Sequence, residues 1–321
     1  MRMLLPLSAI AFATYLAAAD TPTLALIVGN KEENSLAIVD PASGNVVARM
    51  PTGDGPHEVA VSDDGKLAFV ANYGTATAPG NTLSVIDLVG QKEVRKVDLS
   101  PLGRPHGLAV AGGKVYFTAE ANRIVGRYDP AANKIDWMVG TGQATTHMVI
   151  AGKVPDQLFT ANIGSDSICV IEKGVVTTIP VGKGPEALDI SPDGRELWTA
   201  HSRDGGLSII YIATKKVIAT LALETRRSNR LKFTPDGKRV LITDLDAGDL
   251  LVLDAGTRTV THRLKLGKTP EGILMAKDGS RAYVCVAGDN QIAVVDLKTL
   301  EVTGHLTTGK GPDGMAWADR R

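Results

Sequence analysis

One short motif occurs seven times along the chain, and this repetition limits the possible folds more than any other feature. Three copies are nearly the same, at Gly55–Lys66 (GPHEVAVSDDGK), Gly184–Arg195 (GPEALDISPDGR) and Thr269–Ser280 (TPEGILMAKDGS). Looser copies begin near residues 104, 146, 228 and 311. A repeat of this kind indicates an array of small structural units rather than one conventional globular core.

We call the residue after the proline of the motif, or its equivalent, the marker position. The seven marker residues are His57, His106, His147, Glu186, Asn229, Glu271 and Asp313. They are separated by 39 to 49 residues, which is the length of one four-stranded blade of a β-propeller. Within each unit, short apolar runs alternate with turns such as Asp193-Gly194, in which glycine accepts a positive φ.

The two ends of the repeat array complement each other. Residues 314–317 are a first strand without successors, whereas residues 24–29, 35–39 and 45–50 are three strands without a first strand. Pairing them would close the ring and remove exposed strand edges. The sequence therefore predicts an all-β, seven-bladed β-propeller with four-stranded antiparallel blades. The closing blade would combine the C-terminal strand with three N-terminal strands, and residues 20–321 would form a single domain.

The N-terminus is typical of a secretory signal. One arginine precedes an apolar run at residues 4–16, and three alanines at 17–19 resemble a cleavage site. We expect residues 1–19 to be removed and the protein to be periplasmic or secreted, as a monomer. No later segment has the apolar length of a membrane-spanning helix.

Composition excludes some classes of function. The chain has 35 Lys and Arg against 35 Asp and Glu, so it lacks the positive field that nucleic-acid binding requires. Aromatic residues make up only 4% of the chain, too few for base-stacking platforms. Cys169 and Cys285 lack the spacing of a metal or redox motif and are expected to be buried. Trp137, Trp198 and Trp317 are expected to pack between blades.

The repeats also resemble a known family. Phe69-Val-Ala-Asn72, Phe159-Thr-Ala-Asn162 and the frame Pro-x-x-Val-Ala-Val-Ser-x-Asp-Gly are similar to the YVTN β-propeller repeat. The resemblance covers residues 21–321 and implies the propeller fold. It does not imply one function, since this fold carries surface-layer, binding and enzymatic proteins. The Gly-His and Trp-Asp signature of WD40 repeats does not recur.

The propeller topology predicts where functional side chains gather. In a four-stranded meander, the loop entering the first strand and the end of the second strand lie on one face, here called the upper face. The marker residues should therefore meet the second-strand ends at the mouth of the central channel. Those ends are Asn30, Asn72, Glu120, Asn162, His201 and Asp244. Candidate ligand-binding residues for a small molecule or protein are Asn72, Tyr73, Glu120, Asn162, His201, Arg226 and Arg230.

Three of the six histidines occupy consecutive marker positions. His57, His106 and His147 could surround a divalent metal ion, because neutral imidazole is a ligand for Zn, Cu, Fe or Ni. Glu186 or Glu271 could then accept a proton. The alternative is a solvated channel rim, where strand starts are polar whatever the function.

Two further resemblances favour an enzyme. Pro105-His-Gly-Leu-Ala-Val110, Val115-Tyr-Phe-Thr-Ala-Glu120 and the segment from Asn122 are similar to the repeat of streptogramin lyases. This resemblance implies metal-assisted opening of a lactone, with His106 and His147 as ligand or base and Glu120 as acidic partner. Tyr116 stands where those repeats have tryptophan. Gly55-Pro-His57 resembles a blade opening of lactonase propellers.

The sequence thus leaves two hypotheses open. The first is an exported propeller that binds a ligand, a metal or a protein at its upper face without turning it over. The second is a metal-assisted lyase or lactonase at the channel mouth, with catalytic roles for Glu186, Glu271 and His106. No Gly-x-Ser-x-Gly motif or phosphate-binding glycine loop supports serine or nucleotide chemistry.

Overall fold

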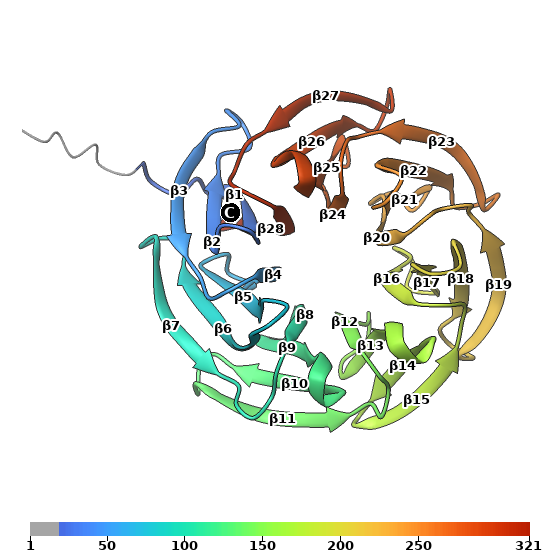
Figure 1. Cartoon of the computed structure of the whole chain (residues 1–321), viewed down its shortest axis with the longest axis horizontal. Helices are drawn as coiled ribbons and strands as arrows, with labels where there is room; N and C mark the ends of the chain where they lie inside the picture. Colours follow the sequence, from blue (N-terminus) through green and yellow to red (C-terminus); the bar gives the residue numbers. More distant parts are fainter. Residues whose placement is uncertain (1–18) are drawn as a thin grey trace, which may run out of the picture.

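A computed structural model describes residues 19–321 and contains seven four-stranded antiparallel sheets arranged in a ring (Figure 1). The fold class and number of blades predicted from the repeat are confirmed. The expected signal segment lies, apart from Ala19, outside the described residues. Among the described residues, no helix is long and apolar enough to cross a membrane.

Each blade runs from an innermost strand at the channel to an outermost strand at the rim (Figure 1). The first four blades are β28 (Pro312–Asp319), β1 (Leu24–Asn30), β2 (Ser35–Val39), β3 (Val46–Pro51); β4 (Pro56–Val61), β5 (Leu67–Gly74), β6 (Pro79–Asp87), β7 (Lys92–Asp98); β8 (Pro105–Ala111), β9 (Lys114–Ala119), β10 (Ile124–Asp129), β11 (Lys134–Gly140); and β12 (Thr146–Ala151), β13 (Gln157–Asn162), β14 (Ser167–Glu172), β15 (Val175–Pro180).

The other three blades are β16 (Pro185–Ile190), β17 (Glu196–His201), β18 (Gly206–Tyr211), β19 (Lys216–Ala222); β20 (Ser228–Phe233), β21 (Arg239–Asp244), β22 (Asp249–Asp254), β23 (Thr259–Lys265); and β24 (Pro270–Met275), β25 (Arg281–Val286), β26 (Gln291–Asp296), β27 (Glu301–Leu306). Three short 3₁₀ helices follow second strands, at η1 (Glu120–Asn122), η2 (Ile163–Ser165) and η3 (Ala287–Asp289).

The ring closes between the two ends of the chain. Strand β28 pairs with β1 in antiparallel register from Leu24↔Asp319 to Asn30↔Pro312. The closing blade therefore has the predicted composition. Strand β1 is therefore hydrogen-bonded along both edges, to β28 on one side and to β2 on the other, and neither of its edges is open to solvent.

Apolar side chains fill the spaces between blades. Trp198 is fully buried and its ring lies edge-on to Phe233 of the next blade, with centroids 5.2 Å apart. Trp317 packs against Tyr283 and donates a hydrogen bond to the Met275 carbonyl. Each fully buried side chain of this size contributes about 1.5–3 kcal/mol relative to exposure. The predicted inter-blade role of these two tryptophans is confirmed.

Trp137 lies beside Tyr116 of its own blade and against Leu158 of the next, as predicted. Cys169 and Cys285 are both buried and unpaired, and each lies within an apolar cluster. The prediction that the two cysteines act as small buried residues is also confirmed.

A β-bulge marks the start of every innermost strand. In all seven blades, the pairing between the innermost and second strands shifts register at the marker position. In one blade, Pro56 pairs with Asn72 and Val59 with Val70, so that His57 and Glu58 together oppose one residue. A bulge re-aims side chains locally, and here it directs the marker residues toward the channel.

Candidate functional site

The mouth of the channel on the upper face contains a cavity of about 320 Å³. All seven marker residues line it, although they come from seven different blades. The remaining lining residues are Lys31, Tyr73, Arg227, Arg230, Leu245 and Thr269. The sequence prediction that the marker positions converge on one site is therefore met by the geometry.

Three imidazole rings, tilted relative to one another, form one wall of the cavity. The ring centroids of His57 and His106 are 4.1 Å apart, and those of His106 and His147 are 3.7 Å apart. Gly107 permits this approach, because a Cβ there would lie 2.6 Å from the Val149 nitrogen and 2.8 Å from the His147 carbonyl oxygen. The glycine thus sets the spacing between two neighbouring innermost strands.

His106 is 1% exposed, and neither of its ring nitrogens has a hydrogen-bond partner in the protein. Nε2 of His147 is likewise buried and unpartnered. Burial lowers the pKa of His106 well below its ordinary value, and the neighbouring His147 and His57 add to this effect. His106 is therefore neutral at pH 7 and offers a nitrogen lone pair.

A hydrogen-bonded chain supports one end of the imidazole wall. The Tyr73 hydroxyl donates to Oε2 of Glu120 over 2.6 Å, and Nδ1 of His147 lies 2.5 Å from Oε1. Burial would raise the pKa of Glu120, but the bonds from His147 and Tyr73 outweigh it and the net pKa is lowered. Burial and the Glu120 carboxylate raise the pKa of Tyr73 to about 12, so the phenol keeps its proton.

Asp313 supports the opposite end of the wall. Its Oδ2 lies 2.7 Å from Nδ1 of His57, in a contact too poorly aligned to be a hydrogen bond, and 3.2 Å from Nζ of Lys31. Burial raises the pKa of Asp313, but Lys31, His57 and Arg230 outweigh it and hold the pKa well below its ordinary range. Asp313 is therefore a carboxylate at all pH values near neutrality.

Glu271 differs from Asp313 although both contact Lys31. Its Oε2 lies 3.0 Å from Nζ of Lys31. Burial and the negative charge of Asp313 raise the pKa of Glu271 to about 7, despite the opposing effect of Lys31. A carboxyl group with this pKa can both accept and release a proton near neutral pH.

The rest of the rim is a network of paired charges. Arg230 is buried and its guanidinium lies 2.5 Å from Glu58 and 3.6 Å from Asp313. Glu186 accepts a hydrogen bond from the Asn229 side chain over 2.7 Å. These pairs reduce the energetic cost of placing several charges in a poorly solvated site.

The structure does not bring all of the expected second-strand residues to the cavity. Asn72 binds the Gly53 amide and two hydroxyl groups of β6, and Asn162 binds Ser167. His201 contacts Asp204 in its own turn. Likewise, Asn30 donates to the Ser35 hydroxyl of its own blade and to the Thr308 carbonyl in the loop before β28, and Asp244 accepts hydrogen bonds from backbone amides that include that of the exposed Arg226. None of these five residues, nor Arg226, lines the cavity, because the second-strand side chains before the loops face the blade interior.

Several residues of the site were not predicted, and two of them, Lys31 and Glu58, pair with its charged groups. Lys31 comes from the loop after β1, and Glu58 follows a marker residue. The bulge explains Glu58, since it turns two consecutive residues of the innermost strand toward the channel. The motif Pro-His-Glu contains the signal for Glu58, but nothing in the sequence singles out Lys31.

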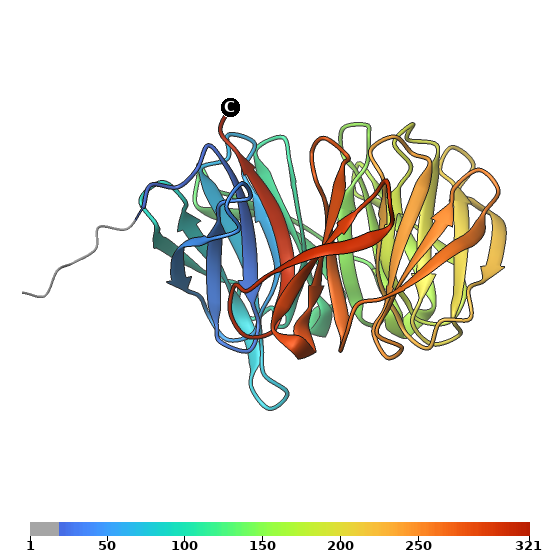
Figure 2. The same ribbon diagram turned by 90° about the horizontal axis from the view of Figure 1, so that it is seen from above.

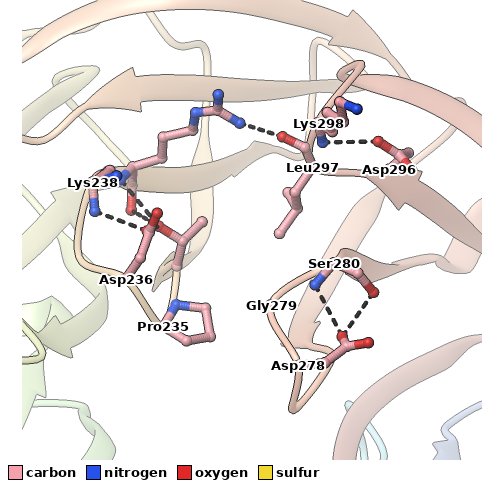
Figure 3. A pocket seen from close by; sticks show the side chains of 11 residues that line it. Pro235, Asp236, Lys238, Asp278, Gly279, Ser280, Asp296, Leu297 and Lys298 are labelled. Carbon is pink, nitrogen blue, oxygen red and sulfur yellow. Dashed lines mark hydrogen bonds between the residues drawn. The ribbon is translucent and has the colours of Figure 1, made fainter.

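A larger hollow of about 820 Å³ lies between the blades of β21 and β25, beside the Asp-Gly turns (Figure 3). Its acidic side chains accept hydrogen bonds from backbone amides within their own turns. Asp236 accepts from the Lys238 amide, Asp278 from the Ser280 amide and Asp296 from the Lys298 amide. These contacts explain the acidic residues as turn formers, so the channel mouth remains the candidate site.

Comparison with known proteins supports the fold and leaves the family open. No protein-family model matches the chain, so the YVTN assignment stays a resemblance. A curated relative, antigen Lp49 of Leptospira interrogans, is 24% identical over 50% of this chain and 40% of its own length. The chain thus spans well under two thirds of that relative.

Two solved structures illustrate the range of proteins with this fold. The periplasmic gluconolactonase of Pseudomonas aeruginosa superposes with a TM-score of 0.75 at 16% identity, over 93% of this chain and 99% of that one. The hydrazine synthase of Kuenenia stuttgartiensis superposes with a TM-score of 0.69 at 20% identity, over 81% and 88%. At such identities the similarity defines the class, a seven-bladed β-propeller, and nothing finer.

Proposed function

We propose that this protein binds a small polar molecule at the mouth of its central channel. The observation that carries this proposal is His106, a fully buried imidazole with two unpartnered nitrogens on the wall of a 320 Å³ cavity. Leaving a buried polar group unsatisfied costs about 1–3 kcal/mol, so a bound ligand, ion or water should satisfy it. The volume is at the lower end of the range for small-molecule sites.

We further propose that a divalent transition-metal ion forms part of this site, with His57, His106 and His147 as ligands. Neutral imidazoles suit Zn and related ions. The charges around the mouth favour a cation, because five carboxylates face three cationic side chains. The carboxylates are Glu58, Glu120, Glu186, Glu271 and Asp313, and the cations are Lys31, Arg227 and Arg230.

Zinc titration against a chromogenic chelator tests the metal proposal. The wild type should bind one equivalent of Zn²⁺, and the variant His106→Asn should lose it while keeping the far-ultraviolet circular dichroism of the wild type. His262→Asn, on the exposed outer strand β23, is the matched control and should bind like the wild type. Equal binding by all three proteins, or by none, would favour the solvated channel rim.

A second candidate function is the opening of a lactone. It is favoured by Glu271, whose pKa near 7 suits acid–base catalysis, and the periplasmic gluconolactonase has the same fold. When bound, a divalent ion would supply Lewis-acid polarisation of the lactone carbonyl. Glu271 would take a proton from the attacking water and return it to the ring oxygen as the acyl C–O bond breaks. Glu186 is the other carboxylate placed for this role.

Glucono-δ-lactone hydrolysis in a pH-stat tests this candidate. Loss of the general base in Glu271→Gln should lower kcat/KM by about 10²–10⁴-fold, whereas Glu301→Gln, on the exposed strand β27, should leave it unchanged. The product separates two reactions, since hydrolysis yields a hydroxy acid and a lyase yields an unsaturated acid. No catalysed turnover of this lactone would leave ligand binding without catalysis as the proposal.

We also propose that the protein is exported as a monomer after removal of residues 1–19. The support is the signal-like N-terminal pattern. Cell fractionation and mass spectrometry should find a periplasmic or secreted chain that begins at Asp20 and elutes at the size of one chain. An intact N-terminus on a cytoplasmic protein would contradict the proposal.

A further inference from the structure

We propose that Tyr73 and Glu120 are positioning residues that fix the tautomer of His147, so that the channel mouth selects a nitrogen-preferring transition-metal ion over Mg²⁺ or Ca²⁺. This inference rests on the metal proposed above and names the class of ion and the residues that set it. In this proposal Glu120 does not bind the metal ion itself but holds His147, which does.

The hydrogen bond at Nδ1 determines which nitrogen of His147 is free. Because a carboxylate only accepts, Nδ1 must carry the proton in the 2.5 Å contact with Glu120. The lone pair of the neutral ring is then at Nε2, which is buried and unpartnered. Histidines that bind metals commonly donate their other nitrogen to a carboxylate in this way, which orients the ring and makes it more basic.

Glu120 is itself held in place on both sides. Its second oxygen accepts the Tyr73 hydroxyl over 2.6 Å. The Tyr73 ring is covered by the Arg104 guanidinium, 4.9 Å from its centroid, and Arg104 also donates to the Thr75 and Ala76 carbonyls. Residues 75–79 form the exposed tip of the β5–β6 hairpin, which projects beyond the ring in Figure 2. The phenol is therefore fixed before any ion arrives.

This arrangement leaves nitrogen atoms as the open ligands. Both carboxylate oxygens of Glu120 are engaged, whereas ring nitrogens of His106 and His147 are buried and unpartnered, and candidate ligand atoms of these two residues lie within 4.8 Å of each other. The Tyr73 ring also packs edge-on against two of the histidine rings. Its centroid lies 5.2 Å from that of His57 and 5.5 Å from that of His106. Mg²⁺ and Ca²⁺ require oxygen ligands, so an imidazole set should exclude them.

A competing arrangement makes Glu120 a direct ligand. Candidate ligand atoms of His106, Glu120 and His147 lie within 4.8 Å of one another, and two histidines with one carboxylate form a known type of iron site. In that arrangement Glu120 would have to give up a hydrogen bond to bind the ion. The two arrangements predict different effects of Glu120→Gln.

The test is titration of the whole secreted chain with Zn²⁺ and with Co²⁺, whose visible absorption reports its ligands. Loss of a supporting carboxylate should weaken Zn²⁺ binding by 10–100-fold in Glu120→Gln. Tyr73→Phe should weaken it about ten-fold, the equivalent of one hydrogen bond to a charged group of about 1.5 kcal/mol, and should shift the Co²⁺ spectrum only slightly. His147→Ala should abolish binding. Mg²⁺ and Ca²⁺ at millimolar concentration should not compete.

Glu301→Gln, outside the site, is the matched control and should bind Zn²⁺ like the wild type. Equal affinities of Glu120→Gln and this control would overturn the inference. A loss as complete as that of His147→Ala, with a changed Co²⁺ ligand spectrum, would show Glu120 to be a direct ligand and would also overturn it. If the wild type binds no Zn²⁺, both this inference and the proposed metal site are refuted. The glucono-δ-lactone assay tests lactone opening independently of that result.

Discussion

Asp313, in the last strand of the chain, lies 2.7 Å from Nδ1 of His57, in the first complete blade. The contact exists only because β28 closes the ring by pairing with β1. Ring closure therefore completes the candidate site. Asp313 also lies beside Lys31 and Arg230, so that one carboxylate contacts two cations and a histidine.

We expect Asp313→Asn to destabilise the protein by about 3–5 kcal/mol, because it takes one carboxylate partner from the buried Arg230 and from the half-buried Lys31. Chemical denaturation measures this difference. Asp319→Asn, at the exposed end of the same strand, removes only surface ion pairs with Lys277 and Arg321 and should leave stability nearly unchanged. Similar losses in both variants would contradict a special role for Asp313.

Gly107→Ala should push two innermost strands apart and separate the rings of His106 and His147. Its Cβ would meet backbone atoms within 2.8 Å, and overpacking of this kind costs about 1–3 kcal/mol. Gly140→Ala in the same blade meets nothing within 4 Å and is the control. Denaturation midpoints and zinc affinity should both fall in the first variant only. A tolerated Gly107→Ala would show that the close approach is not required.

Glu271 should make stability depend on pH in a predictable direction. Its folded pKa is raised from 4.5 to about 7, so its contribution is complete below pH 4.5 and is lost as pH rises through 7. Between pH 5 and pH 8 the free energy of unfolding of Glu271→Gln, relative to wild type, should therefore rise by about 1–3 kcal/mol.

The difference in unfolding free energy between Glu271→Gln and the wild type isolates the contribution of Glu271 from those of the other titrating groups. His106 has a lowered pKa, so its contribution has the opposite sign and is lost as pH falls below 6.5. That contribution is present in both proteins and cancels in the difference. A difference that stays constant from pH 5 to pH 8 would mean that Glu271 titrates as an ordinary glutamate.

The two cysteines should be unreactive in the native protein. Cys169 and Cys285 are both buried, and burial raises the pKa of the Cys285 thiol well above its ordinary value. A thiol reagent should modify neither in native buffer and both in denaturant, since the thiolate is the reactive form. Rapid reaction of either thiol in buffer would contradict the packing around β14 and β25.

The sequence predicted the ring and the convergence of the marker residues, because a repeat of about 40 residues fixes both the blade and the equivalent positions within it. It did not separate residues that face the channel from residues that face the blade. Asn72 and His57 are neighbours across one strand pair. The side chain of Asn72 forms hydrogen bonds inside the blade, whereas that of His57 lines the cavity. The bulge that makes this distinction depends on backbone register, which residue types do not specify.

The partners of the histidines were also beyond sequence reasoning. The contact of Tyr73 with Glu120 joins two neighbouring blades, and that of Asp313 with His57 joins the closing blade to the next one. Such contacts depend on how side chains of neighbouring blades meet. Their chemistry, two carboxylates flanking a wall of three imidazoles, depends on blades that are far apart in the sequence.

The most direct test of the proposed metal site at the channel mouth is anomalous diffraction at the zinc edge from crystals equilibrated with Zn²⁺. We expect one strong anomalous peak at the channel mouth, about 2.0–2.1 Å from Nε2 of His147 and from a nitrogen of His106. A saturating zinc concentration that gives no peak there, or peaks only at surface carboxylates, would contradict it.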